Sequence, residues 1–160
     1  MTALETVHAI ELRHITKRFG KVVANDDIDL ALDRGEILSL LGENGSGKTT
    51  LMNMLSGIYF PDEGEILVEG RPAAIRSPKD AFDHGIGMIH QHFKLIDVFT
   101  AAENIVLGLH DGSRLDRREI AAKVKEISDR YGFGIDPNKK VYDMSVSEKQ
   151  TVEIVKVLYR

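Results

Sequence analysis

The chain has 160 residues, 42% of them hydrophobic and 29% charged, which is close to the usual composition of a globular domain. Its net charge of −4 provides no overall positive field to attract nucleic acid, and without cysteine it has no disulfide or thiolate metal site. The N-terminus lacks the basic patch and apolar run of a signal peptide, and no apolar run approaches the roughly 20 residues of a membrane-spanning helix. We therefore expect a soluble polypeptide that acts at a membrane only through another subunit.

The N-terminal half of the chain predicts strands of two kinds. Apolar residues alternate with aspartates between residues 27 and 33, which is typical of an antiparallel strand with one buried face. Residues 36–41 (EILSLL) are apolar nearly throughout, as in a strand covered on both faces, and residues 86–90 (IGMIH) predict a further buried strand. Residues 64–70 (GEILVEG) predict a short strand that ends in a glycine turn.

Helices are expected at five places, each marked by the glycine loop or by a capping residue. The first helix is predicted to start at Lys48, and the others at Ser77, Thr100, Asp116 and Ser145. Apolar residues at helical spacing predict the buried face of the last two helices. These are Ile120, Val124, Ile127 and Tyr131 in one, and Val152, Val155 and Leu158 in the other.

Residues 42–49 (GENGSGKT) satisfy the phosphate-loop pattern G-x-x-x-x-G-K-[ST] between a predicted buried strand and an amphipathic helix. The glycines let backbone N–H groups point inward at one anion, and the start of the helix adds its positive end. Lys48 would contact the β and γ phosphates, and the Thr49 hydroxyl would bind Mg²⁺. The alternative, a glycine-rich turn without a ligand, is disfavoured by this context. The expected nucleotide-binding residues of the loop are Gly42, Glu43, Asn44, Gly45, Ser46, Gly47, Lys48, Thr49 and Thr50.

Residues 18–70 resemble the nucleotide-binding subunits of ATP-binding-cassette (ABC) transporters, with an antiparallel segment before the loop and S-G…P-x-x-G-x-I after it. The resemblance runs from about Ile10 to the last residue. It implies an α/β P-loop NTPase fold, with an N-terminal antiparallel β subdomain and the P-loop core in residues 1–92. Residues 93–160 would form a helical subdomain with the signature helix. The implied cofactors are ATP and Mg²⁺.

The resemblance also assigns roles to two residues outside the loop. Phe19 occupies the position where the family stacks an aromatic ring on adenine, although an aromatic residue in a strand needs no special reason. Gln91 matches the glutamine that reaches Mg²⁺ and the attacking water, which makes it the catalytic candidate and, with Thr49, a metal ligand. A glutamine at a strand end can also be merely polar.

Residues 93–108 (FKLIDVFTAAENIVLG) resemble the start of the helical subdomain. Their apolar residues either line a groove that accepts a helix from a transmembrane permease subunit or belong to the core of the subdomain, and both alternatives stay open. These residues are Phe93, Leu95, Ile96, Val98 and Phe99.

The family signature L-S-G-G-Q corresponds here to MSVSE, with Ser145, Val146, Ser147 and Glu148 as the residues that would face the γ-phosphate of a second, head-to-tail cassette. An anionic Glu148 would repel that phosphate unless it turned away, for example by capping back toward Ser145. The relaxed signature resembles that of bacterial importers for simple sugars and nucleosides, which often carry two cassettes in one polypeptide. The chain looks like the first part of the N-terminal one.

In the family, an apolar strand ending in Asp-Glu and a later histidine follow the signature. Neither is found up to Arg160, so the C-terminal core strands and the general base are expected to be missing, and the 160-residue chain is not expected to hydrolyse ATP at a family-like rate.

The function implied is the ATP-binding portion of an importer motor subunit, peripheral on the cytoplasmic face of the cell membrane. It would work with permease subunits and, indirectly, a solute-binding protein, and not with nucleic acid. The alternatives are a non-transport ABC ATPase of translation or DNA repair, and a regulatory cassette deficient in hydrolysis.

Overall fold

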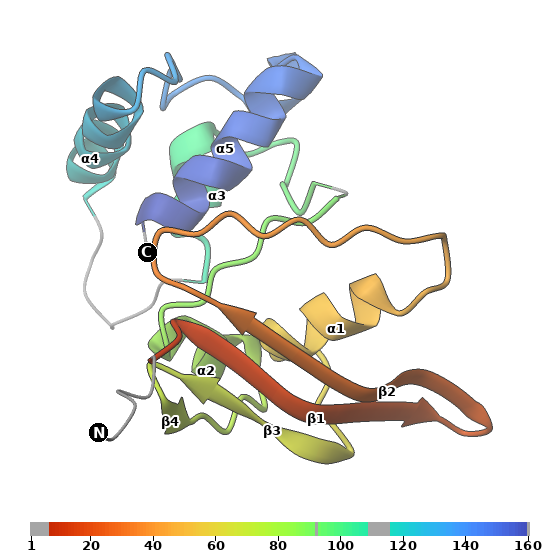
Figure 1. Cartoon of the computed structure of the whole chain (residues 1–160). Coiled ribbons are helices and arrows are strands. Elements are labelled where there is room, and N and C mark those ends of the chain that lie inside the picture. The colour runs from red at the N-terminus through yellow and green to blue at the C-terminus, as the bar shows by residue number, and fades with distance from the viewer. Residues whose placement is uncertain (1–6, 92, 109–115, 160) are drawn as a thin grey trace. The chain divides into compact units, whose positions relative to one another are not determined.

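The computed structural model describes residues 7–91, 93–108 and 116–159 (Figure 1). The chain forms two compact units, Met1–Gly87 and Met88–Arg160. All the named strands belong to the first unit, and the second is built from helices and loops. Among the described residues, no helix is long and apolar enough to cross a membrane.

The sheet of the first unit has four strands in the order β2-β1-β3-β4 (Figure 1). They are β1 (Ile10–Phe19), β2 (Val22–Leu32), β3 (Glu63–Val68) and β4 (Arg71–Pro72), and every pair is antiparallel. The alternation predicted between residues 27 and 33 is confirmed, because the apolar side chains of β2 are half-buried there and the aspartates are exposed. The short strand predicted in residues 64–70 is confirmed as β3, which turns at Gly70 into β4.

Two helices complete the first unit, α1 (Lys48–Leu55) and α2 (Pro78–Asp83). Helix α1 packs on one face of the sheet through its three buried residues (Figure 1). The Ser77 hydroxyl caps α2 by accepting a hydrogen bond from the Asp80 N–H at 3.2 Å, as predicted. The shared core consists of Leu12, Ile15, Leu51, Met54, Leu55, Ile66, Ala73, Ile75 and Ala81.

The two buried strands predicted at residues 36–41 and 86–90 are wrong, because neither segment is a strand. Ile37 is 94% exposed and Leu41 is 92% exposed. A strand that is apolar on both faces needs hydrogen-bonded neighbours in a sheet as well as cover on each face. Among the described residues, all four strands belong to the antiparallel sheet, and none of them pairs with either segment.

The second unit contains α3 (Ala101–Val106), α4 (Arg117–Arg130), a short 3₁₀ turn (Val141–Asp143) and α5 (Val146–Tyr159). The capping box predicted at Thr100 is confirmed, and the Asp116 side chain caps α4 by accepting from the Arg118 N–H. The core of this unit consists of Ala101, Ala102, Ile105, Ile120, Val124, Ile135, Val141, Met144, Val152 and Val155.

Two residues of the predicted apolar stripes lie outside this core. Tyr131 is 51% exposed because α4 has already ended, and its ring stacks on Phe133 at 5.8 Å between centroids. Leu158 is 43% exposed. It follows the buried Val152 by six residues, which turns it roughly 120° away around a helix of 3.6 residues per turn.

Candidate functional site

The glycine loop ends where α1 begins, and the start of this helix has no cap of its own. Gly47 is the N-cap residue, no side chain accepts a hydrogen bond there, and the first turn contains no acidic residue. The first N–H groups of a helix have no partner within the helix, and the helix dipole adds partial positive charge at this end. The start of α1 is therefore suited to bind an anion.

Gly47 is fixed in place by strand β2. Its φ of 85° lies in the left-handed region, and an added Cβ would collide with the carbonyl oxygen of Ala24. The Asn25 amide of the same strand donates a long hydrogen bond to the Gly47 carbonyl, at 3.4 Å. The sequence motif requires glycine at this position because the loop passes directly against the sheet.

Replacing Gly47 with alanine should lower the free energy of unfolding by about 3 kcal/mol, because the side chain adds a collision to the cost of about 1–2 kcal/mol for a left-handed residue. Gly132→Ala is the matched control, since Gly132 has a φ of 71° but open space around its Cα. It should cost only about 1 kcal/mol. Urea unfolding of both variants measures the difference, and equal losses would show that β2 does not constrain the loop.

Lys48 places its ammonium group over the glycine loop. Its Nζ donates hydrogen bonds to the carbonyl oxygens of Gly42 and Glu43, both at 2.7 Å, and to the Ser46 hydroxyl at 3.1 Å. A phosphate chain that enters the loop would meet this charge together with the uncapped N–H groups of α1. Thr49 stands exposed in the first turn of the same helix, and its contact with Mg²⁺ stays a prediction.

Phe19 is the last residue of β1 and is 43% exposed. The register of the sheet pairs Lys17 with Asn25, whose side chain contacts the Gly47 carbonyl. Phe19 follows Lys17 by two residues, which is roughly 7 Å along a strand. The structure therefore brings Phe19 and the phosphate loop to the same end of the sheet. Its stacking on adenine stays a prediction.

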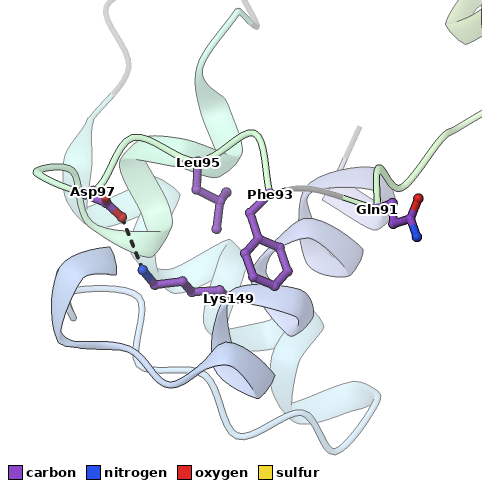
Figure 2. Close-up of a pocket in the computed structure, with 5 residues that line it drawn as sticks. All are labelled: Gln91, Phe93, Leu95, Asp97 and Lys149. Atoms are coloured by element: carbon purple, nitrogen blue, oxygen red, sulfur yellow. Dashed lines mark hydrogen bonds and ion pairs between the residues drawn. The ribbon is translucent and has the colours of Figure 1, made fainter.

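Gln91 belongs to the second unit, so its predicted contact with Mg²⁺ and water stays untested. It is exposed and lies at the edge of a hollow of about 270 Å³, apart from the other residues that line it (Figure 2). Phe93 and Leu95 supply the apolar part of this hollow, and Asp97 and Lys149 form an ion pair at 3.2 Å on the side away from Gln91 (Figure 2).

The apolar residues predicted for a permease groove divide between surface and interior. Phe93, Ile96 and Val98 are 37%, 38% and 65% exposed. Leu95 and Phe99 are half-buried, and Leu95 packs against the core of the second unit. Leu95 thus fits the alternative of a subdomain core, and the permease groove stays a prediction for the exposed residues.

The segment that carries these residues is held by two buried polar side chains that the sequence patterns did not single out. The Asn104 amide donates to the carbonyl oxygens of Ile96 and Thr100 and accepts from the Ile96 N–H. Glu153 of α5, only 3% exposed, accepts from the Lys94 N–H at 2.8 Å. In the sequence, Asn104 and Glu153 differ from other polar residues only in having apolar neighbours on a predicted helix, which is a weak indication of burial.

The signature residues form a reciprocal cap at the start of α5. The Ser145 N–H donates to the Glu148 carboxylate at 2.8 Å, and the Glu148 N–H donates to the Ser145 hydroxyl at 3.3 Å. Lys139 donates to the other oxygen of this carboxylate at 2.6 Å. The hydrogen bond from Lys139, followed by that from the Ser145 amide, lowers the pKa of Glu148 to about 2. The expected alternative in which Glu148 caps back toward Ser145 is therefore the one that the structure has. Val146 and Ser147 are exposed.

Replacing Glu148 with glutamine should remove a pH-dependent part of the stability. Because the pKa of Glu148 falls from 4.5 to about 2 on folding, its stabilising effect is complete above pH 4.5 and is lost as the pH falls toward 2. The wild type should be the more stable protein at pH 6, and the difference should shrink between pH 4.5 and 2. Urea unfolding at several pH values measures this, and Lys139→Met should reproduce most of the effect. Parallel profiles for the wild type and Glu148→Gln would contradict it.

The family model of the ABC transporter matches residues 25–160. The chain belongs to the ABC transporter family. NupA of Lactococcus lactis, a nucleoside import ATP-binding protein, is 51% identical over 99% of this chain and 31% of its own length. NupO of Bacillus subtilis, a guanosine import ATP-binding protein, is 52% identical over 96% of this chain and 30% of its own length. The chain thus spans less than a third of these curated relatives.

The structure is similar to that of CbiO1 from Clostridium perfringens, part of the ABC transporter complex cbiONQ. The TM-score is 0.77 at 25% identity, and the match covers 96% of this chain and 62% of CbiO1. The predicted ABC cassette fold is therefore confirmed, as part of a cassette. Membership of the family implies ATP binding, in agreement with the uncapped helix and the ammonium group at the glycine loop.

Proposed function

We propose that this chain is the ATP-binding portion of an importer motor subunit that drives uptake of nucleosides or simple sugars. The observation that carries the proposal is a phosphate loop with an uncapped helix start and a Lys48 ammonium, in a chain about half identical to two nucleoside import proteins. The importer, its solute and its hydrolytic activity belong to the whole protein.

In this proposal the triphosphate lies along residues 42–50. The Lys48 ammonium would bind the β and γ phosphates, and the N–H groups of α1 would surround them. The Thr49 hydroxyl and the Gln91 side chain would bind Mg²⁺, with Gln91 also orienting the attacking water, and Phe19 would stack on adenine. These donors fit the group, because the loop supplies positive charge for phosphate and neutral oxygens for a hard cation.

The hollow of the second unit would receive a segment of a permease subunit at the cytoplasmic face of the membrane. Phe93 offers a partly exposed apolar surface, and the Asp97–Lys149 ion pair lies across the hollow from Gln91 (Figure 2). An amphipathic helix with one apolar anchor and a polar neighbour suits such a surface. Other proposed partners are a second cassette and, indirectly, a solute-binding protein.

The residues 145–148 would face the γ-phosphate bound to that second cassette. The negative charge of the Glu148 carboxylate would weaken this contact, because it would repel the γ-phosphate at short range. Its contacts with the Ser145 N–H and the Lys139 ammonium would offset the charge and hold the carboxylate in a fixed position. Retention of hydrolysis by the whole transporter would be compatible with this arrangement.

The test is uptake of radiolabelled guanosine and ribose by cells that lack the gene. Uptake of at least one solute should fall, and the wild-type gene should restore it while Lys48→Ala should not. Unchanged uptake of both solutes, with the protein sedimenting with ribosomes, would instead support a translation ATPase. Restoration of uptake by Lys48→Ala would overturn the proposal, and a purified transporter complex without ATP turnover would favour the regulatory alternative.

A further inference from the structure

Two aromatic rings from distant parts of the chain meet just past the C-terminal end of α1. The centroids of Phe19, at the end of β1, and Tyr59, just after α1, lie 5.1 Å apart with their planes at 70°. This is the edge-to-face arrangement that aromatic pairs prefer. Phe19 and Tyr59 are 43% and 36% exposed, so neither residue belongs to the core, and both are partly accessible to solvent.

Tyr59 is connected to the loop through helix α1. The N–H groups of Ile58 and Tyr59 both donate to the carbonyl oxygen of Asn53, at 2.9 and 3.1 Å, so Tyr59 directly follows the last turn. The same helix begins at Lys48. A rigid helix of eight residues, about 12 Å long, therefore joins the phosphate-binding end to the aromatic pair.

The backbone beside Tyr59 is held in place without the help of its ring. The Asp62 N–H donates to the Thr16 carbonyl at 2.9 Å, and the Asp62 carboxylate accepts from the Arg18 N–H at 2.6 Å and from Lys17 at 2.9 Å. The backbone of residues 59–62 is thus fastened to β1 by hydrogen bonds that do not involve the Tyr59 ring, and this ring packs against Phe19.

Lys17 completes the surroundings of the Phe19 ring. Its ammonium lies 5.5 Å from the ring centroid, within the range of a cation–π contact, and the ion pair with Asp62 keeps it there. Phe19 therefore has a cation and an aromatic ring as fixed neighbours, which restrict its rotation about χ1 and χ2. A ring that must present one surface to a flat ligand gains affinity when its orientation is set before binding.

We propose that Tyr59 is a positioning residue for the nucleotide base, holding the Phe19 ring in the orientation in which adenine stacks on it. The inference rests on the proposed nucleotide site at the phosphate loop. It names a residue that affects binding of the adenine base, through Phe19, and does not affect binding of the phosphates. Tyr59 should therefore affect the preference for ATP over inorganic tripolyphosphate, which offers the same phosphates without a base.

The experiment measures the affinities of the purified protein for ATP and for tripolyphosphate by calorimetry, and compares their ratio among variants. Phe19→Leu should lower the ratio about tenfold, the loss of one base–aromatic contact. Tyr59→Leu should lower it about three- to tenfold while leaving tripolyphosphate binding unchanged. Tyr59→Phe, which retains the ring, should keep the wild-type ratio.

The double variant and a matched tyrosine complete the design. If Tyr59 acts through Phe19, the variant with both leucines should resemble Phe19→Leu alone. Tyr142→Leu changes a tyrosine that is 60% exposed in the second unit and should have no effect on the ratio. A Tyr59→Leu protein that keeps the wild-type ratio, or loses both ligands equally, would overturn the inference. Absence of tripolyphosphate binding by the wild type would instead overturn the phosphate site itself.

Discussion

Replacing Lys48 with alanine should lower the affinity for Mg²⁺-ATP about a hundredfold. Hydrogen bonds that involve a charged group contribute about 1.5–3 kcal/mol each, and the ammonium is expected to contact both the β and γ phosphates. A total loss of about 3 kcal/mol corresponds to about two orders of magnitude in the dissociation constant. Calorimetric titration of the wild type and the variant with Mg²⁺-ATP measures the change.

Lys79→Ala is the matched control, because it also removes a lysine of the first unit, from α2 rather than from the loop. It should bind ATP as the wild type does. Circular dichroism should show that both variants are folded, since the three acceptors of Lys48 lie in an exposed loop that water can reach. A folded Lys48→Ala protein with an affinity within threefold of the wild type would contradict the assignment of the loop.

Replacing Asn104 with alanine should lower the free energy of unfolding by about 3 kcal/mol. The side chain is fully buried and makes three hydrogen bonds, at 2.7, 3.0 and 3.1 Å, to the backbone of Ile96 and Thr100. Its removal leaves the Ile96 N–H without this partner, which costs about 1–3 kcal/mol. The loss of two further hydrogen bonds and of buried side-chain volume adds to this cost, although the Ile96 carbonyl still accepts from the Phe99 N–H at 3.0 Å.

Urea unfolding measures this loss, with Asn138→Ala as the control. Asn138 belongs to the same unit but is exposed, and its change should be within about 0.5 kcal/mol of the wild type. Hydrogen exchange should also become faster at the amide of Ile96, which Asn104 protects. A loss below about 1 kcal/mol would show that water or another group replaces Asn104.

The features predicted correctly from the sequence depend on residues that are close together in the chain. The caps at Ser77 and Thr100 each involve an N–H group three residues away, so the pattern of side chains suffices to place them. The phosphate loop and the start of α1 at Lys48 are local in the same sense. The identity of the family followed from the longer stretch of residues 18–70, because the phosphate loop alone does not distinguish among P-loop families.

The strands predicted at residues 36–41 and 86–90 were wrong because a strand exists only with a partner. Their apolar composition indicates that both faces of each segment could be buried. Whether a segment forms a strand also depends on hydrogen bonds to other segments. Contacts between distant residues limit the prediction of the candidate site in the same way. Tyr59 meets Phe19 across 40 positions, and Glu153 accepts a hydrogen bond from Lys94 across 59. No periodicity within a single helix or strand predicts such contacts.

The exposed apolar stretch at residues 36–41 has a consequence for the behaviour of the chain at high concentration. Six residues with high hydrophobicity, one charge and no proline or glycine match the segments that assemble into cross-β fibres. The charged residues Asp33, Arg34 and Glu36 stand immediately before or at the start of this stretch. They act as gatekeepers, because stacking identical copies would bring like charges into register. Neutralising these charges should therefore favour the assembly of the segment into fibres.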